Sequence, residues 1–411
     1  MKLLSMTACL IFVLLIVIVP GCRDIDPASP PAVNTGTADF ARYVALGSSN
    51  TAGFQSGGLV EKFQARSYPA MIADAARAAT FEFPAVSEPG IPPLMVVKSL
   101  VPVQLDTLDG MGMPTNLTYP GIYNNLGIPG ATLSQLLNAT PAEPSNPFFG
   151  MVLRDPALGA TVLAQARNLQ PTFATVWAGN YDVLWSFLKG TDQLMTPTSA
   201  FLDLFTAMID SLRESCDDIV VANIPDPMLL PYATTVPPIV VDPVTREPVL
   251  NPATGEYIPL IGVVQGVPGP LPLTARVLLP ATAYMAQGIG IPSAIGGTGL
   301  ALDDTLIIDA TEAAAIHERV EAFNMIIGNV CAVRDIPVVD LYAFFMSVFT
   351  SDITIRDDIF TFGYITGGLF SLDGVHLSMM GHYIVANEFI HTINAAFGAD
   401  LPEPPLPYTI R

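Results

Sequence analysis

Two kinds of hydrophobic pattern alternate along the chain. Short runs composed mostly of apolar residues predict strands that are buried on both faces. These runs occupy residues 43–46, 171–178, 218–224 and 336–341. In the segments between them, apolar residues recur at helical spacing, which predicts amphipathic helices. The predicted helices span residues 68–79, 155–169, 198–214, 312–333 and 376–397.

The alternation of strands with helices predicts an α/β fold, in which helices cover both faces of a parallel sheet. Residues 80–123 are rich in proline and predict one irregular strand within long loops, followed at 124–137 by a glycine-punctuated loop that leads into a helix. Residues 225–300 are crowded with proline and glycine and carry few charges, so we expect a hairpin and loops inserted into one domain. That domain spans residues 40–400 and is followed by a C-terminal tail at 401–411.

The N-terminus has the pattern of an export signal. Residues 8–19 are uninterruptedly apolar after Lys2, a run too short to span a membrane comfortably. The run ends in VPGC and resembles a bacterial lipoprotein signal, which implies that residues 1–21 are removed and that Cys22 is lipidated. Residues 22–39 then form a flexible tether. Ordinary secretion, with Cys22 as an incidental thiol, is the alternative.

Composition narrows the possible functions. Of the 411 residues, 51% are hydrophobic and only 13% are charged, with a net charge of −20. This acidic balance argues against a nucleic-acid partner, which requires clustered lysine and arginine. Besides Cys22, the mature chain keeps Cys216 and Cys331, which either pair or are buried as small apolar residues. The spacing of the potential ligands predicts no metal site.

Candidate chemistry lies at two distant points of the sequence. Ser49 follows the first predicted strand, and ligands of open α/β sheets bind beyond the carboxyl ends of the strands. Near the C-terminus, Asp373 precedes His376 by three residues, just before an apolar helix. At this spacing a carboxylate can hold one imidazole nitrogen while the other nitrogen faces a nucleophile. The simpler interpretations are a polar turn around Ser49 and a helix cap at Asp373.

Taken together, these segments resemble the SGNH hydrolase superfamily, the GDSL esterases and lipases, and in particular its bacterial lipoprotein-type members. Gly47-Ser48-Ser49 corresponds to the first family block, and Asn125 with Gly130 corresponds to the second. GNYD at 179–182 corresponds to the third block, and Asp373 with His376 to the fifth. The resemblance implies a three-layer α/β/α sandwich with a five-stranded parallel sheet, and it implies that no cofactor is needed.

The same resemblance implies a Ser49–His376–Asp373 triad and an acyl-enzyme mechanism. It also implies an oxyanion hole made by the backbone amides of Ser49 and Gly130 and by one side chain. Here the sequence departs from the family twice: Ser48 replaces the usual aspartate, and Tyr181 stands where the family has the oxyanion asparagine. Asn180 lies one position earlier, so either side chain is a candidate for the third donor.

Three hypotheses follow from these observations. The first is a lipid-anchored serine esterase of the cell envelope, placed at the outer membrane, which cleaves small-molecule, lipid or acylated-glycan esters. The second is a catalytically impaired lipoprotein that binds ester or glycan ligands on the same fold. The third is a structural envelope lipoprotein in which the motif matches are coincidental, so that Ser49 and His376 lie far apart.

Overall fold

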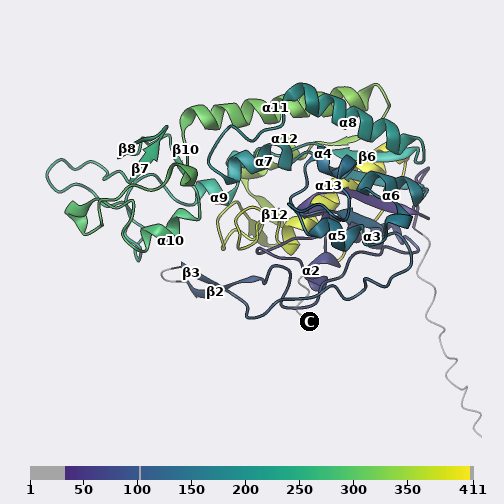
Figure 1. Cartoon of the computed structure of the whole chain (residues 1–411), viewed down its shortest axis with the longest axis horizontal. Coiled ribbons are helices and arrows are strands. Elements are labelled where there is room, and N and C mark those ends of the chain that lie inside the picture. Colours follow the sequence, from purple (N-terminus) through teal and green to yellow (C-terminus); the bar gives the residue numbers. More distant parts are fainter. Residues whose placement is uncertain (1–32, 101–102, 408–411) are drawn as a thin grey trace, which may run out of the picture. The chain divides into compact units, whose positions relative to one another are not determined.

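The computed structural model describes residues 33–100 and 103–407, and at its centre lies a five-stranded parallel sheet (Figure 1). The strands are β1 (Tyr43–Gly47), β4 (Asn125–Gly127), β5 (Phe173–Trp177), β6 (Asp218–Ala222) and β11 (Val338–Val339). Their spatial order is β11-β6-β5-β1-β4. The strand β1 pairs in parallel with both the edge strand β4 and the central strand β5. This arrangement confirms the predicted fold class.

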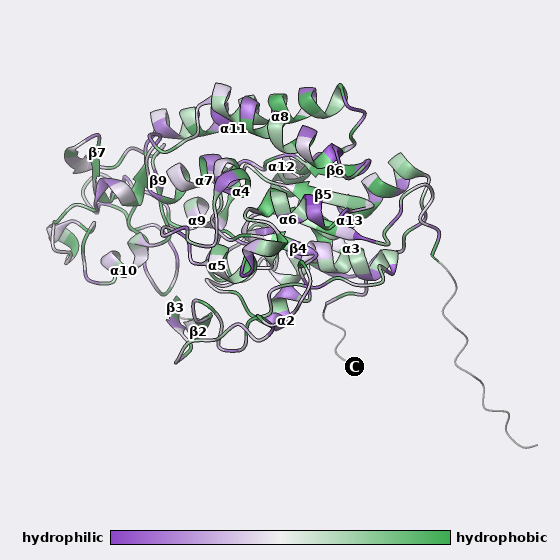
Figure 2. Ribbon diagram, turned by 45° about the vertical axis from the view of Figure 1, so that its right-hand side comes forward, coloured by the Kyte–Doolittle hydropathy of each residue, from purple (hydrophilic) through white to green (hydrophobic). Residues whose placement is uncertain are grey.

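Alternate side chains of the strands enter two separate hydrophobic cores. Val44 and Leu46 of β1 belong to one core, together with side chains of the helices α4 (Leu133–Asn138), α6 (Val162–Asn168), α8 (Thr198–Arg213) and α11 (Ala310–Ala332). Tyr43 and Ala45 belong to the other core, together with α3 (Tyr68–Ala76), α12 (Leu341–Ser351) and α13 (Met379–Phe397). Helices therefore cover both faces of the sheet, and Figure 2 shows the hydrophobic strands β5 and β6 between them.

The helix ends follow from capping residues. The Asp309 carboxylate accepts hydrogen bonds from the first turn of α11, and the Glu312 carboxylate accepts one from the Asp309 backbone amide. The Ser378 hydroxyl accepts from two amides at the start of α13. Consequently α13 begins three residues later than predicted, and His376 lies in the loop before it. Shorter helices are α1 (Ser49–Ala52), α2 (Glu61–Gln64), α5 (Phe148–Val152), α7 (Tyr181–Leu188), α9 (Pro231–Thr234) and α10 (Ala281–Met285).

Two sequence predictions about the loops are wrong. The fifth strand of the sheet is β4, which lies inside the segment predicted to be a loop at 124–137. Residues 80–123 contribute instead the antiparallel hairpin of β2 (Met95–Leu100) and β3 (Val103–Thr107), which stands apart from the sheet. In addition, the predicted helix 155–169 is a short 3₁₀ turn, Pro156–Leu158, followed by α6. Both α12 and the hairpin of β12 (Ile353–Ile355) and β13 (Asp358–Phe360) went unpredicted.

The insertion contains the expected hairpin, formed by β7 (Ile261–Val264) and β8 (Val267–Pro270). It also contains β9 (Arg276–Val277), which pairs with β10 (Ile307–Ile308) just before α11. Its apolar residues form a small core of their own around Leu260, Val277 and Leu302. Figure 1 shows β7, β8 and α10 to one side of the central sheet. The insertion nevertheless belongs to the same compact unit as the sheet.

Cys216 and Cys331 are buried free thiols in the structure, and burial raises the pKa of each thiol to about 12. Of the two possibilities left open by the sequence, the structure therefore has the unpaired one. The signal segment 1–21 and Cys22 lie outside the described residues. Within the described part of the chain, no helix combines the length and the apolar composition needed to cross a membrane.

Candidate active site

Ser49 lies just beyond the carboxyl end of β1, where the chain turns into α1. Gly47 makes this turn possible, because a Cβ atom there would lie 2.1 Å from Thr51 Oγ1 and 2.4 Å from the Trp177 carbonyl oxygen. The Ser49 side chain is almost fully buried. The next residue is Asn50, and its Oδ1 accepts a hydrogen bond of 3.4 Å from the Leu377 amide. This bond connects α1 to the loop that carries His376.

His376 and Asp373 face each other as the sequence predicts. Nδ1 of His376 lies 2.9 Å from Asp373 Oδ2. The same carboxylate also accepts hydrogen bonds from the Val375, His376 and Gly57 amides at 2.8–2.9 Å. Asp373 therefore holds the histidine and does not cap α13, whose cap is Ser378.

The Asp373 carboxylate is ionised despite its burial. Burial by itself raises the pKa of this group, but the neighbouring imidazole and the backbone amides that donate to it outweigh that effect and lower the pKa to about 2. An ionised carboxylate only accepts hydrogen bonds, so Nδ1 of His376 carries the proton. Nε2 of His376 is therefore unprotonated and available as an acceptor when the ring is neutral. This is the tautomer that a general base requires.

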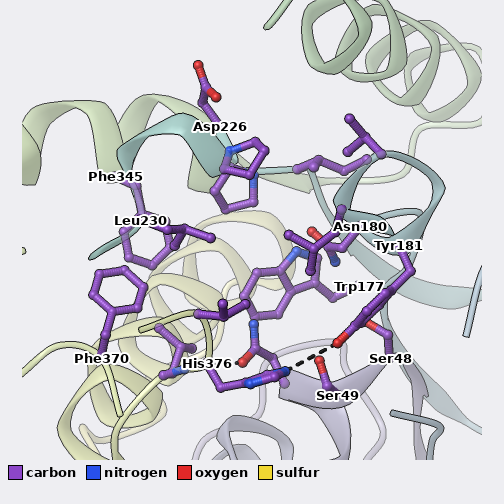
Figure 3. A pocket seen from close by; sticks show the side chains of 18 of the residues that line it. Ser48, Ser49, Trp177, Asn180, Tyr181, Asp226, Leu230, Phe345, Phe370 and His376 are labelled. Carbon is purple, nitrogen blue, oxygen red and sulfur yellow. Dashed lines mark hydrogen bonds between the residues drawn. The ribbon is translucent and has the colours of Figure 1, made fainter. Parts of the chain in front are cut away.

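Tyr181 adds a hydroxyl group at the same point. Its oxygen lies 3.3 Å from His376 Nε2, and it also has a hydrogen-bonding interaction with the Ser49 side chain. Figure 3 shows the Ser49 and Tyr181 hydroxyls close together near the end of the His376 ring, with a hydrogen bond from Tyr181 to His376. Burial raises the pKa of Tyr181 to about 12, so its proton stays on the oxygen at neutral pH. In this structure the Tyr181 hydroxyl therefore donates to Nε2, the acceptor that a Ser49 nucleophile needs.

Backbone amides for an oxyanion are present beside the nucleophile. Within the described chain, the N–H groups of Ser49 and Gly130 donate no hydrogen bond. Gly130 lies in the loop after β4, which pairs with β1, and its φ of +81° belongs to the region that glycine favours. Asn125 fixes this loop because its amide donates to the Thr51 carbonyl of α1 at 2.7 Å.

The two candidates for the side-chain donor lie differently. The Tyr181 hydroxyl reaches the Ser49–His376 pair, whereas Asn180 precedes the helix α7 and lines the adjoining cavity. The Asn180 side chain makes no hydrogen bond within the described residues. The structure thus brings Ser49, Tyr181 and His376 together, with Asn180 beside them (Figure 3).

Asp182 is a buried residue of the third block for which no role was predicted. Its carboxylate accepts hydrogen bonds from the Leu133 amide at 2.8 Å and from the Thr196 hydroxyl at 2.7 Å. Burial raises its pKa to about 6. Because Leu133 begins α4, Asp182 joins the segment after Gly130 to the helix that carries Tyr181. The only indication of this role in the sequence is the position of Asp182 in the GNYD motif, directly after Tyr181.

The other histidines lie outside this group. His317 Nδ1 lies 2.7 Å from Asp226 Oδ2, an ion pair that joins α11 to the start of the insertion. His382 is fully buried within α13, and its Nδ1 accepts a hydrogen bond from the Tyr68 amide. His391 lies near Glu388 on the same helix. Across residues 33–100 and 103–407, no cluster of three His, Cys, Asp or Glu side chains is arranged to hold a metal ion.

The parallel sheet, the serine at a strand end and the His–Asp pair define an α/β serine hydrolase. The sequence matches the family described as GDSL-like Lipase/Acylhydrolase over residues 43–389. Because this match covers most of the chain, the protein belongs to that family and is a serine esterase or lipase-like hydrolase that acts on esters.

Solved structures with similar folds share little sequence with this chain. A lipase/acylhydrolase from Enterococcus faecalis is 12% identical, with a TM-score of 0.34, over 88% of this chain and 98% of its own. An acetylxylan esterase from Geobacillus stearothermophilus is 12% identical, with a TM-score of 0.37, over 87% and 96%. A phospholipase A1 from Streptomyces albidoflavus is 14% identical, with a TM-score of 0.35, over 86% and 98%. No curated protein matches the chain. These similarities carry no argument about the substrate.

Proposed function

We propose that the protein is a lipid-anchored esterase of the cell envelope, in which Ser49 forms an acyl-enzyme with the substrate. The observation that carries this proposal is the hydrogen-bonded arrangement of Asp373, His376, Tyr181 and Ser49 at the carboxyl end of β1. It supplies a nucleophile, a base in the correct tautomer and a carboxylate that orients the base.

In the proposed reaction, His376 Nε2 takes the Ser49 proton while Oγ bonds to the ester carbonyl carbon. The Ser49 and Gly130 amides and the Tyr181 hydroxyl donate to the negative charge that develops on the carbonyl oxygen. The imidazolium, stabilised by Asp373, returns the proton to the departing alcohol as the ester bond breaks. A water molecule then gives a proton to His376 and attacks the acyl carbon, and the acid leaves as the proton returns to Ser49.

Labelling with a fluorophosphonate tests this proposal, with the mature domain and its Ser49→Ala variant compared in parallel. We expect covalent labelling and hydrolysis of p-nitrophenyl butyrate by the parent, and loss of both in the variant. A control variant, Ser215→Ala at the end of α8, should keep both activities. A folded parent protein that neither labels nor turns over would instead support the binding lipoprotein, in which the Tyr181 hydroxyl occupies the acceptor at His376.

The lipid anchor is proposed from the sequence alone, because the VPGC motif places Cys22 at the position of a lipoprotein cysteine. Expression of the full chain in a bacterial host with a radiolabelled fatty acid tests it. Incorporation of label that disappears in Cys22→Ser, followed by release of the variant from the membrane fraction, is expected. Equal incorporation by both proteins would refute the anchor but not the esterase. Placement at the outer membrane would be tested by fractionating the two membranes.

A further inference from the structure

A cavity with mostly apolar walls opens directly from Ser49 and His376. Its volume is about 630 Å³ when the open mouth and the solvent space in it are included. The cavity runs from the catalytic residues between the helix α7, the start of the insertion and the helix α12 (Figure 3). Its walls include large hydrophobic side chains, among them Trp177, Ile224, Leu230, Phe345, Phe362 and Phe370.

Two polar groups that line the cavity, those of Trp177 and Asp226, are already engaged, whereas the Asn180 side chain makes no hydrogen bond within the described residues. The Trp177 indole N–H donates to the Asn223 carbonyl at 3.1 Å. The Asp226 carboxylate is held by His317 and by the Met228 amide at 2.7 and 2.9 Å. Figure 3 shows this carboxylate directed away from the Ser49–His376 pair. A polar ligand such as a sugar would therefore find few partners along these walls, and its desolvation would be uncompensated.

The end of the cavity is preformed by packed aromatic rings. The Phe362 ring centroid lies 5.9 Å from that of Phe345 and 5.0 Å from that of Phe370, and all three side chains are buried. These distances are typical of stabilising aromatic pairs. Leu230, which is only partly buried, packs against the core that contains these rings and also lines the cavity.

We propose that this cavity binds the acyl chain of the substrate, and that the enzyme prefers esters of medium-length saturated acids, such as hexanoyl or octanoyl esters, over acetyl esters. This inference rests on the proposed function, since it needs an acyl group bonded to Ser49. The acyl group stays on the enzyme while the alcohol leaves, so an apolar cavity that begins at Ser49 suits the acyl side. The alcohols of lipid and glycan esters are polar, and the walls offer them few hydrogen bonds.

A series of p-nitrophenyl esters from acetate to decanoate tests the preference. Burial of each additional methylene should raise kcat/KM about fourfold until the cavity is filled. Leu230→Phe should shift the optimum to shorter chains, and Leu230→Ala should shift it to longer ones. Leu202→Phe, on the exposed face of α8, is the matched control and should leave the profile unchanged.

A flat profile, or a profile that neither Leu230 variant moves, would overturn the inference while leaving the esterase intact. A second series, of alkyl acetates, tests the alcohol side. If the rate of hydrolysis rises with the length of the alcohol and falls in Leu230→Phe, the cavity binds the alcohol, and the inference about the acyl chain is overturned.

A binding measurement keeps the cavity testable if turnover is absent. Trp177 lines the cavity, and the chain has only one other tryptophan, so Ser49→Ala combined with Trp185→Phe leaves a single tryptophan, which can be excited selectively at 295 nm. A terminally brominated octanoate should quench its fluorescence saturably, and Leu230→Phe should weaken this binding at least fivefold. Quenching without turnover in the parent would refute the proposed esterase but support the acyl-chain cavity. Absence of quenching at millimolar ligand, in a protein that hydrolyses esters, would refute the cavity alone.

Discussion

Replacing Tyr181 with phenylalanine separates the two roles that its hydroxyl can have. If the hydroxyl donates to the oxyanion, its removal should lower kcat by about 10²–10³, which corresponds to roughly 2.7–4 kcal/mol of transition-state stabilisation. The proton is available for this role, because burial raises the Tyr181 pKa to about 12. The Ser49 and Gly130 amides would remain as donors, so activity should fall without vanishing.

The fold should tolerate this change. The Tyr181 ring is buried and packs against Trp185, with 5.3 Å between the ring centroids, and phenylalanine keeps that ring. Loss of the buried hydroxyl should cost about 1 kcal/mol of unfolding free energy. Urea unfolding therefore separates a folding defect from a catalytic one. KM should change little, since the lost interaction belongs to the transition state.

The measurement is kcat for p-nitrophenyl butyrate in Tyr181→Phe and in Asn180→Ala, prepared side by side. A large fall in the first and a fall below threefold in the second would assign the donor to Tyr181. The reverse result would refute this reasoning and assign it to Asn180. A rise of kcat in Tyr181→Phe would also refute it, because the hydroxyl would then act only as a competitor of Ser49 for His376 Nε2.

Two further predictions concern the carboxylates. Asp373→Asn should lower kcat about 10⁴-fold, because it favours the wrong His376 tautomer. The same carboxylate should also stabilise the fold, because its pKa of about 2 in the folded protein is below the value in the unfolded chain. Its contribution to the unfolding free energy should be about 2 kcal/mol above about pH 4. Urea titrations should show this difference from the variant vanish as the pH falls through 2, and a constant difference would contradict it. The Asp226 carboxylate raises the pKa of His317, so NMR titration of Asp226→Asn should show that pKa falling toward about 6.5; an unchanged value would exclude the ion pair as its cause.

The long apolar elements of the fold could be predicted from the sequence, and the strand β4 could not. This strand is only three residues long. Its first residue, Asn125, is polar and pairs with Ala45 of β1. Asn125 is present because its amide holds the Thr51 carbonyl, not because it favours a strand. At position 127 only glycine fits, because the Cβ atom of any other residue would lie 2.4 Å from the Ala52 amide nitrogen. The residues of β4 are therefore chosen for their contacts with α1. They do not form the apolar run from which a strand is predicted.

The candidate triad could be predicted from motif spacing, because Asp373 and His376 are close in sequence and Ser49 follows a recognisable strand. The reach of the Tyr181 hydroxyl could not be predicted in the same way. It depends on α7 beginning at Tyr181, which directs the ring across the carboxyl end of the sheet toward a loop 195 residues later. The role of Asp182 was hidden for the same reason, since its partners, Leu133 and Thr196, belong to separate segments.

The replacement of the usual aspartate by Ser48 does not leave the nucleophile segment loose. The turn after α1 contacts the His376 loop directly, through bonds from the Gly57 amide to Asp373 and from the Ser56 amide to the Ser371 hydroxyl, both at 2.9 Å. The Ser56 hydroxyl in turn accepts from the Leu372 amide at 3.3 Å. These bonds couple segments more than 300 residues apart at the point where Asp373 orients the base. The relative placement of nucleophile and base therefore rests on this backbone contact and does not require a carboxylate before Ser49.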